Sequence, residues 1–336
     1  MLFSLFLISC EQPTKPIHIW QHSSNGSASA AISHDGQFSV VAGFNEPTGY
    51  WNLNTNARLF NWRSVPDSHF SDKDPIQLVA ISAENKRVMT ASINNFIIWD
   101  TASGKSLGYY KAPSQIRAIA LSRMARFVLL GLADGRVVFM SLKQGKRLEF
   151  LGHRLHAQKI FKDPGLSPNW VGINSVDLSP NGKYAISGGD DHAAIVWDTQ
   201  SGQQLYLWPH KNRVQFVRFS RDGALAFTSS RQAEAYIWNL KTGKKVASLK
   251  LKSRDWIISS ARFSADNTQL VTGSPGRDLK IWRVSDGTLL HKFKVKKRFK
   301  TKASGAVVLD AVFLKNGHVI SESSSGYAEE WTLKNN

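Results

Sequence analysis

The sequence contains a single cysteine, Cys10, among its 336 residues. One cysteine cannot form a disulfide within the chain, and it excludes every zinc site that needs several cysteines. No run of 18 or more apolar residues occurs, so the sequence predicts no membrane-spanning helix. Acidic residues are also scarce, because 25 Asp and Glu stand against 43 Lys and Arg and leave a formal net charge of +18. This excess favours an anionic partner, such as an acidic protein, nucleic acid, lipid head groups or lipopolysaccharide.

The first ten residues, MLFSLFLISC, are uncharged, apolar and too short for a membrane helix. They are typical of a secretion signal, and Leu7-Ile8-Ser9-Cys10 resembles the lipobox of bacterial lipoproteins, in which the cysteine is acylated. The polar segment 11–16 then has the composition of a tether. We therefore expect a signal peptide over residues 1–9, a tether over 10–16, and lipid anchoring through Cys10 at the bacterial cell envelope, at the outer membrane facing the periplasm.

One feature departs from that pattern, because no Lys or Arg precedes Lys15 as the basic start of a signal peptide would require. Either the true start lies upstream of Met1, or residues 1–10 are the frayed apolar end of a cytosolic protein.

A repeated four-residue pattern, apolar at its first and third positions, occurs seven times, and six of the seven copies end in serine. Its copies are Ala30–Ser33, Val79–Ser82, Ile119–Ser122, Val176–Ser179, Val217–Ser220, Ala261–Ser264 and Ala311–Leu314. An aromatic residue follows each copy at a nearly constant distance: Trp51, Trp99, Phe139, Trp197, Trp238, Trp282 and Trp331. A fixed period of this kind predicts a repeat architecture, and the Gly, Asn and Asp between the marks predict hairpin turns.

A fourth strand is indicated in six repeats by a large apolar residue after the aromatic: Trp62, Tyr110, Phe150, Trp208, Leu249 and Phe293. The seventh repeat lacks this strand at its C-terminal end. The segment Ile17-His18-Ile19-Trp20 imitates Leu205-Tyr206-Leu207-Trp208 of the fourth repeat. We therefore expect an all-β propeller of seven four-stranded blades over residues 17–336, with residues 17–21 closing the ring in the last blade.

These repeats resemble the WD40 family of β-propellers, whose signature is a Gly-His before the first strand and a Trp-Asp at the end of the third. The fourth repeat matches best, with Gly152-His153 and Trp197-Asp198. The resemblance implies that His153, Ser187, Asp191 and Trp197 form a buried hydrogen-bonded set with a structural role. Other repeats depart from the signature: blade three has Phe139-Met140, and Gln232 stands where Asp191 would.

The same resemblance places the connections between blades on one face, beside the turns that join second and third strands. Four of these connections are basic: Gly152 to Trp170, His210 to Arg213, Lys252 to Trp256, and His291 to Lys302. The candidate binding residues on this face are Arg154, Lys159, Lys162, Trp170, Lys211, Arg213, Lys252, Arg254, Trp256, Lys294, Lys296, Lys297, Arg298 and Lys300. Basic residues also keep sheet-rich proteins soluble, so any single lysine here needs no further role.

Short matches to catalytic motifs fail in their context. Gly104-Lys105-Ser106 lacks the earlier glycine of a phosphate loop, because Trp99 stands there. His153 and His156 have the spacing of a helical metal pair, but no third ligand is adjacent. We therefore expect no enzyme, no metal and no cofactor.

The resulting hypothesis is a monomeric, non-catalytic scaffold that holds a protein partner with an acidic surface. Two alternatives stay open. One is a periplasmic enzyme or ligand-binding propeller that uses the central channel, since such a site escapes linear motifs. The other is a cytosolic protein associated with nucleic acid or ribonucleoprotein, which export would exclude.

Overall fold

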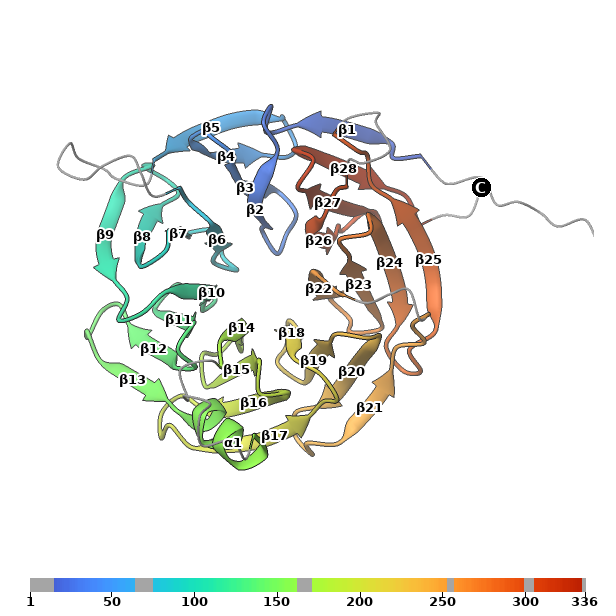
Figure 1. Ribbon diagram of the computed structural model, residues 1–336. Helices are drawn as coiled ribbons and strands as arrows, with labels where there is room; N and C mark the ends of the chain where they lie inside the picture. Colours follow the sequence, from blue (N-terminus) through green and yellow to red (C-terminus); the bar gives the residue numbers. More distant parts are fainter. Residues whose placement is uncertain (1–14, 64–74, 162–170, 253–256, 299–304, 334–336) are drawn as a thin grey trace, which may run out of the picture.

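The computed structural model describes residues 15–63, 75–161, 171–252, 257–298 and 305–333. These residues form 28 strands in seven four-stranded antiparallel sheets, together with one helix, α1 (Gly152–Ile160). The sheets stand around a common axis (Figure 1). In six of them the strand that comes first in the chain is innermost, and in the sheet that contains β1 the innermost strand is β26. This arrangement confirms the predicted all-β, seven-bladed propeller. None of the described residues belongs to a helix long and apolar enough to cross a membrane.

The first three blades occupy the segment before α1. Blade 1 contains β2 (Ser27–Ile32), β3 (Phe38–Gly43), β4 (Thr48–Asn52) and β5 (Ala57–Trp62). Blade 2 contains β6 (Leu78–Ile81), β7 (Arg87–Ala91), β8 (Asn95–Asp100) and β9 (Ser106–Lys111). Blade 3 contains β10 (Ile116–Leu121), β11 (Phe127–Leu132), β12 (Val137–Ser141) and β13 (Arg147–Phe150).

The next three blades follow α1. Blade 4 contains β14 (Ile173–Leu178), β15 (Tyr184–Gly189), β16 (Ala193–Asp198) and β17 (Gln204–Pro209). Blade 5 contains β18 (Val214–Phe219), β19 (Leu225–Ser230), β20 (Glu234–Asn239) and β21 (Lys245–Ser248). Blade 6 contains β22 (Ser260–Phe263), β23 (Gln269–Gly273), β24 (Asp278–Arg283) and β25 (Leu289–Lys294).

Blade 7 joins the two ends of the described chain. Its inner strands are β26 (Val308–Phe313), β27 (Val319–Ser323) and β28 (Tyr327–Trp331), and its outermost strand is β1 (His18–Gln21). The register pairs His18 with Glu330 and Gln21 with Tyr327. The predicted closure of the ring by the N-terminal strand is therefore confirmed (Figure 1).

The serine of the repeated pattern has a local structural function. In six blades its hydroxyl accepts a hydrogen bond from the backbone N–H five residues later, across the turn between the first and second strands. These serines are Ser33, Ser82, Ser122, Ser179, Ser220 and Ser264. Blade 7 has Leu314 at this position. Each serine satisfies a backbone donor that the hairpin would otherwise leave without a partner.

The core is divided into seven apolar clusters, and each lies between neighbouring blades. The cluster of blades 3 and 4, for example, contains Leu129, Phe150, Ile195 and Trp197. The third-strand tryptophan also donates its indole N–H to a Ser or Thr of the second strand. The pairs are Trp99 with Thr90, Trp197 with Ser187, Trp238 with Thr228, Trp282 with Thr272 and Trp331 with Ser321. Burial of the aromatic ring and satisfaction of its only donor thus occur together.

Two blades lack this tryptophan hydrogen bond. In blade 3 both partners are replaced, by Phe139 and Gly131, so no donor is buried. In blade 1 only the acceptor is replaced. Val41 stands at the acceptor position, and the buried Nε1 of Trp51 has no hydrogen-bond partner among the described residues.

The structure corrects three boundaries expected from sequence. The connection after blade 3, for which no helix was expected, begins with helix α1 because residues 152–160 form a short helix against β16. Leu249 lies one residue beyond the end of β21, although its side chain is buried. Strand β25 extends to Lys294, so the connection after blade 6 begins at Val295 rather than at His291.

Candidate functional site

The four residues expected to form a buried set in blade 4 lie in direct contact. His153, on α1, is bonded through Nδ1 to Asp191 Oδ1 at 2.7 Å and through Nε2 to the Ser187 hydroxyl at 2.7 Å. The Trp197 indole N–H donates to the same hydroxyl at 2.8 Å. His156, one helical turn after His153, is bonded through Nδ1 to the other oxygen of Asp191 at 3.1 Å.

Asp191 is therefore the centre of this network. Burial by itself would raise the pKa of Asp191, but the charge and hydrogen bond of His153, and the hydrogen bond of His156, hold that pKa below its ordinary value. Both imidazoles are hydrogen-bonded to the carboxylate of Asp191. No group of three or more His, Cys, Asp or Glu within the described ranges is arranged to hold a metal ion.

The basic residues of the connections divide into two groups, and the first group is anchored by the protein itself. Arg154 donates to the Asp134 carbonyl at 2.5 Å, and Arg213 lies 3.9 Å from Asp190. Lys294 lies on the outermost strand of blade 6 and pairs with Asp278 at 2.9 Å.

Arg298 also belongs to this anchored group. It donates to the Ser24 carbonyl at 3.1 Å and also to the Asn25 carbonyl, joining the connection after blade 6 to the one after blade 7. In these contacts, charged side chains hold the connections between blades in place.

The second group presents its charge outward. Lys159 on α1, Lys211 between β17 and β18, and Lys296 after β25 are exposed, whereas Lys297 is partly buried. Lys159, Lys211 and Lys297 form no ion pair with any described residue. The ammonium group of Lys296 lies 4.0 Å from the ring centroid of Tyr327. Lys252 is exposed and has a partner of its own. Lys162, Trp170, Arg254, Trp256, Lys300 and Cys10 lie outside the described residues.

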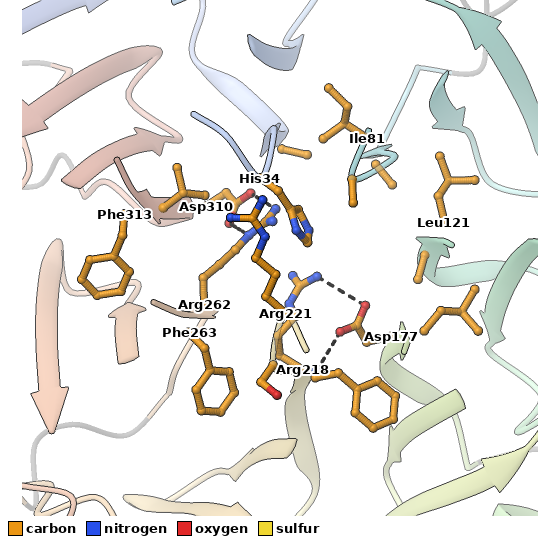
Figure 2. A pocket seen from close by; sticks show the side chains of 18 of the residues that line it. His34, Ile81, Leu121, Asp177, Arg218, Arg221, Arg262, Phe263, Asp310 and Phe313 are labelled. Atoms are coloured by element: carbon orange, nitrogen blue, oxygen red, sulfur yellow. Dashed lines mark hydrogen bonds and ion pairs between the residues drawn. The ribbon is translucent and has the colours of Figure 1, made fainter. Parts of the chain in front are cut away.

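The central channel is a cavity of about 1220 Å³, lined by the innermost strands and by the turns that follow them. Figure 2 shows Arg218, Arg221, Arg262 and His34 in this channel, with Asp177 and Asp310 beside them. Sequence analysis missed this cluster. Its signal was present, because Asp177, Arg218 and Arg262 occupy the second position of the repeated pattern, where blades 1 to 3 have alanine.

Comparison with known proteins agrees with the architecture. The family model for the WD domain, G-beta repeat, matches residues 166–198 and 243–283, segments that include Trp197-Asp198 and Trp282. The chain carries WD40 repeats. The other WD40-like blades are recognised by their sheets and by the tryptophan hydrogen bonds described above.

Several curated proteins align with part of the chain. The Serine-threonine kinase receptor-associated protein of Bos taurus is 25% identical over 167 residues, which are 48% of this chain and 42% of that protein. The Transcription initiation factor TFIID subunit 5 of Caenorhabditis elegans is 22% identical over 176 residues, 52% and 25% of the two chains. The Small ribosomal subunit protein RACK1 of the same organism is 30% identical over 89 residues, which are 25% of this chain and 27% of that protein. The chain thus spans less than half the length of these WD40 relatives.

Proposed function

We propose that this WD40 propeller is a non-catalytic scaffold that binds an acidic protein surface through its inter-blade connections. The observation that carries the proposal is the exposure of Lys159, Lys211 and Lys296, which come from three different connections, with the partly buried Lys297 next to Lys296. Three relatives support it by their names, which describe a receptor-associated protein, a transcription initiation factor subunit and a small ribosomal subunit protein.

The proposed mechanism is electrostatic attraction to a rigid surface. Charges at the edge of an interface accelerate association and select partners of opposite charge, more than they increase final affinity. Because the loops are held by contacts such as Arg298 with Ser24, little conformational entropy is lost when a partner binds.

A charge-reversal experiment tests this proposal with poly-L-glutamate as the probe. The variant Lys211→Glu/Lys296→Glu/Lys297→Glu should bind the probe at least about tenfold more weakly, a loss of about 1.4 kcal/mol. The matched control is Lys241→Glu/Lys244→Glu/Lys245→Glu, which changes the net charge equally on the third-to-fourth-strand side of blade 5. Equal losses in the two variants would show a response to net charge alone and would contradict the proposal.

For the location of the scaffold, lipid anchoring through Cys10 at a bacterial envelope is the candidate, supported by the lipobox-like Leu7-Ile8-Ser9-Cys10. Expression in a bacterium should yield a mature, acylated N-terminus at Cys10 in the membrane fraction, and Cys10→Ser should abolish both. A soluble protein that retains Met1 would favour the cytosolic alternative, and binding to nucleic acid would then be the next measurement.

A further inference from the structure

Arg218, which lines the central channel, has a buried hydrogen-bond donor without a partner among the described residues. Its side chain is mostly buried, and its Nε has no hydrogen-bond partner among the described residues. Nη1 forms an ion pair with Asp177 Oδ1 at 3.6 Å, which is longer than a hydrogen bond. Buried donors of a guanidinium group normally find acceptors, so this one is an exception that needs an explanation.

Two further guanidinium groups lie beside Arg218, from two blades. Arg262 makes a two-pronged contact with Asp310, at 3.1 Å from Nε and 2.6 Å from Nη2. Arg221 lies in the turn that follows β18, is exposed, and forms no ion pair with any described residue. Figure 2 shows the Arg221 side chain beside His34 and Arg262, within the channel. Of these three arginines, Arg218 and Arg262 are each paired with one carboxylate, and Arg221 is paired with none among the described residues.

The two carboxylates are partly engaged elsewhere. Asp177 accepts the Phe219 backbone N–H at 2.8 Å, and Asp310 accepts the Ile32 backbone N–H at 2.9 Å, in each case from the next blade. These bonds hold adjacent blades together at the channel wall. The carboxylates keep their negative charge in these bonds, and positive charge remains in this cluster because Arg221 has no carboxylate partner among the described residues.

His34 lies in the field of these arginines. Burial lowers the pKa of His34 well below its ordinary value, and Arg262, Arg218, Arg221 and Arg123 lower it further. Figure 2 shows three of these arginines, Arg218, Arg221 and Arg262, in the channel with His34. The cavity of about 1220 Å³ leaves room for a ligand beside them.

We propose that Arg218, Arg221, Arg262 and His34 form a binding site for a free phosphate group, either orthophosphate or the phosphate ester of a small molecule. Guanidinium groups match the oxygens of phosphate and carboxylate. Donors from blades 1, 5 and 6 that approach from different directions suit a tetrahedral anion with several oxygens better than a planar carboxylate with two. The proposal is independent of the scaffold function, because this site lies where the innermost strands end and the inter-blade connections lie where they begin.

Titration calorimetry with orthophosphate and with tripolyphosphate, at about 0.15 M ionic strength, tests the site. Arg221→Ala should weaken binding of both at least tenfold, because it removes one of the guanidinium groups of the site. The variant should still fold, because this exposed arginine forms no ion pair with any described residue. The matched control is Arg231→Ala, an exposed arginine in the turn between β19 and β20 at the opposite end of blade 5, which should change binding less than twofold. Arg221→Lys should give an intermediate loss, because it retains the charge and loses the two-pronged geometry.

Proton NMR of the His34 imidazole provides a second readout. A phosphate concentration that just saturates the unaltered protein should shift its resonances and raise its pKa in the unaltered protein and in Arg231→Ala. At the same concentration the change should be much smaller in Arg221→Ala. Equal weakening by Arg221→Ala and Arg231→Ala would show non-specific attraction and overturn the site. An unresponsive His34, no phosphate binding at millimolar concentration, or binding of a phosphoserine peptide without binding of free phosphate would also overturn it. None of these results depends on the poly-L-glutamate experiment, so the two proposals fail separately.

Discussion

Blade 4 and the central channel both bury charged side chains, but they satisfy them differently. In blade 4, Asp191 is bonded to two imidazoles, and His153 is bonded at both nitrogens. In the channel, Arg218 has a long ion pair with Asp177, a contact with the Phe216 ring, and an Nε without a hydrogen-bond partner among the described residues. A buried charge whose bonds are complete stabilises one structure. A buried charge with bonds left over leaves binding capacity for something outside the chain.

The largest expected effect comes from breaking the complete network. Asp191→Ala removes the acceptor of His153 and His156 and should lower the free energy of unfolding by about 3–5 kcal/mol. Gln232→Ala, at the matching turn position of blade 5, should cost less than about 0.5 kcal/mol. Urea denaturation of the two variants measures both, and equal losses would show that Asp191 has no special role.

Arginine replacements in the channel sharpen the comparison further. Arg262→Met leaves Asp310 without its two-pronged partner and should cost about 3 kcal/mol. Arg218→Met should cost about 1 kcal/mol, because it breaks only one long ion pair and removes an unsatisfied donor. A larger loss for Arg218→Met than for Arg262→Met, in the same denaturation experiment, would contradict the distinction.

A reciprocal pair of substitutions tests the tryptophan hydrogen bonds. Thr90→Val in blade 2 leaves the buried Trp99 indole without an acceptor and should destabilise by about 1–3 kcal/mol. Val41→Thr in blade 1 supplies the acceptor that Trp51 lacks and should stabilise by about 1 kcal/mol. Thermal melting shows whether each variant is more or less stable than the unaltered protein. A lower melting temperature for Val41→Thr would contradict the idea that the missing acceptor of Trp51 costs stability.

The smallest expected effect is a change in the dependence of folding stability on pH. Burial raises the pKa of Glu329 in blade 7 to about 7, and the nearby Glu322 adds to the increase. The folded state therefore binds more protons than the unfolded state between the ordinary Glu pKa and 7, so Glu329 makes stability fall as pH rises through that window. Its slope is at most about 1.4 kcal/mol per pH unit. Glu329→Gln should flatten this fall in denaturation curves, and an unchanged slope would assign it to other groups.

The fold was predictable because its signals are local and repeated. The serine pattern, the tryptophan spacing and the His18-Ile19-Trp20 segment each report a nearby turn or strand, and repetition removes chance matches. Sequence also brought His153, Ser187, Asp191 and Trp197 together, through a resemblance rather than through their spacing.

The behaviour of the loop charges could not be predicted in the same way. Arg298 is held by the carbonyls of Ser24 and Asn25, more than 270 positions away in the chain, and no local pattern reports such a contact. The channel cluster was hidden for a similar reason. Arg218 and Arg262 stand out only as charged residues within inward-facing strands, and their convergence with His34 depends on the curvature of the whole ring.

The closure of blade 7 determines the order in which the strands can pair during synthesis of the chain. His18 is synthesised 312 residues before its partner Glu330, so β1 emerges long before β28 exists. Blades 1 to 6 draw their strands from consecutive segments and can assemble as the chain emerges. Strand β1 must wait for β28, and until then Trp20 lacks the apolar cluster of blades 7 and 1 against which it packs. A nascent chain of this design is therefore most vulnerable to proteases and to wrong partners at its N-terminal strand, until the last strand leaves the exit tunnel.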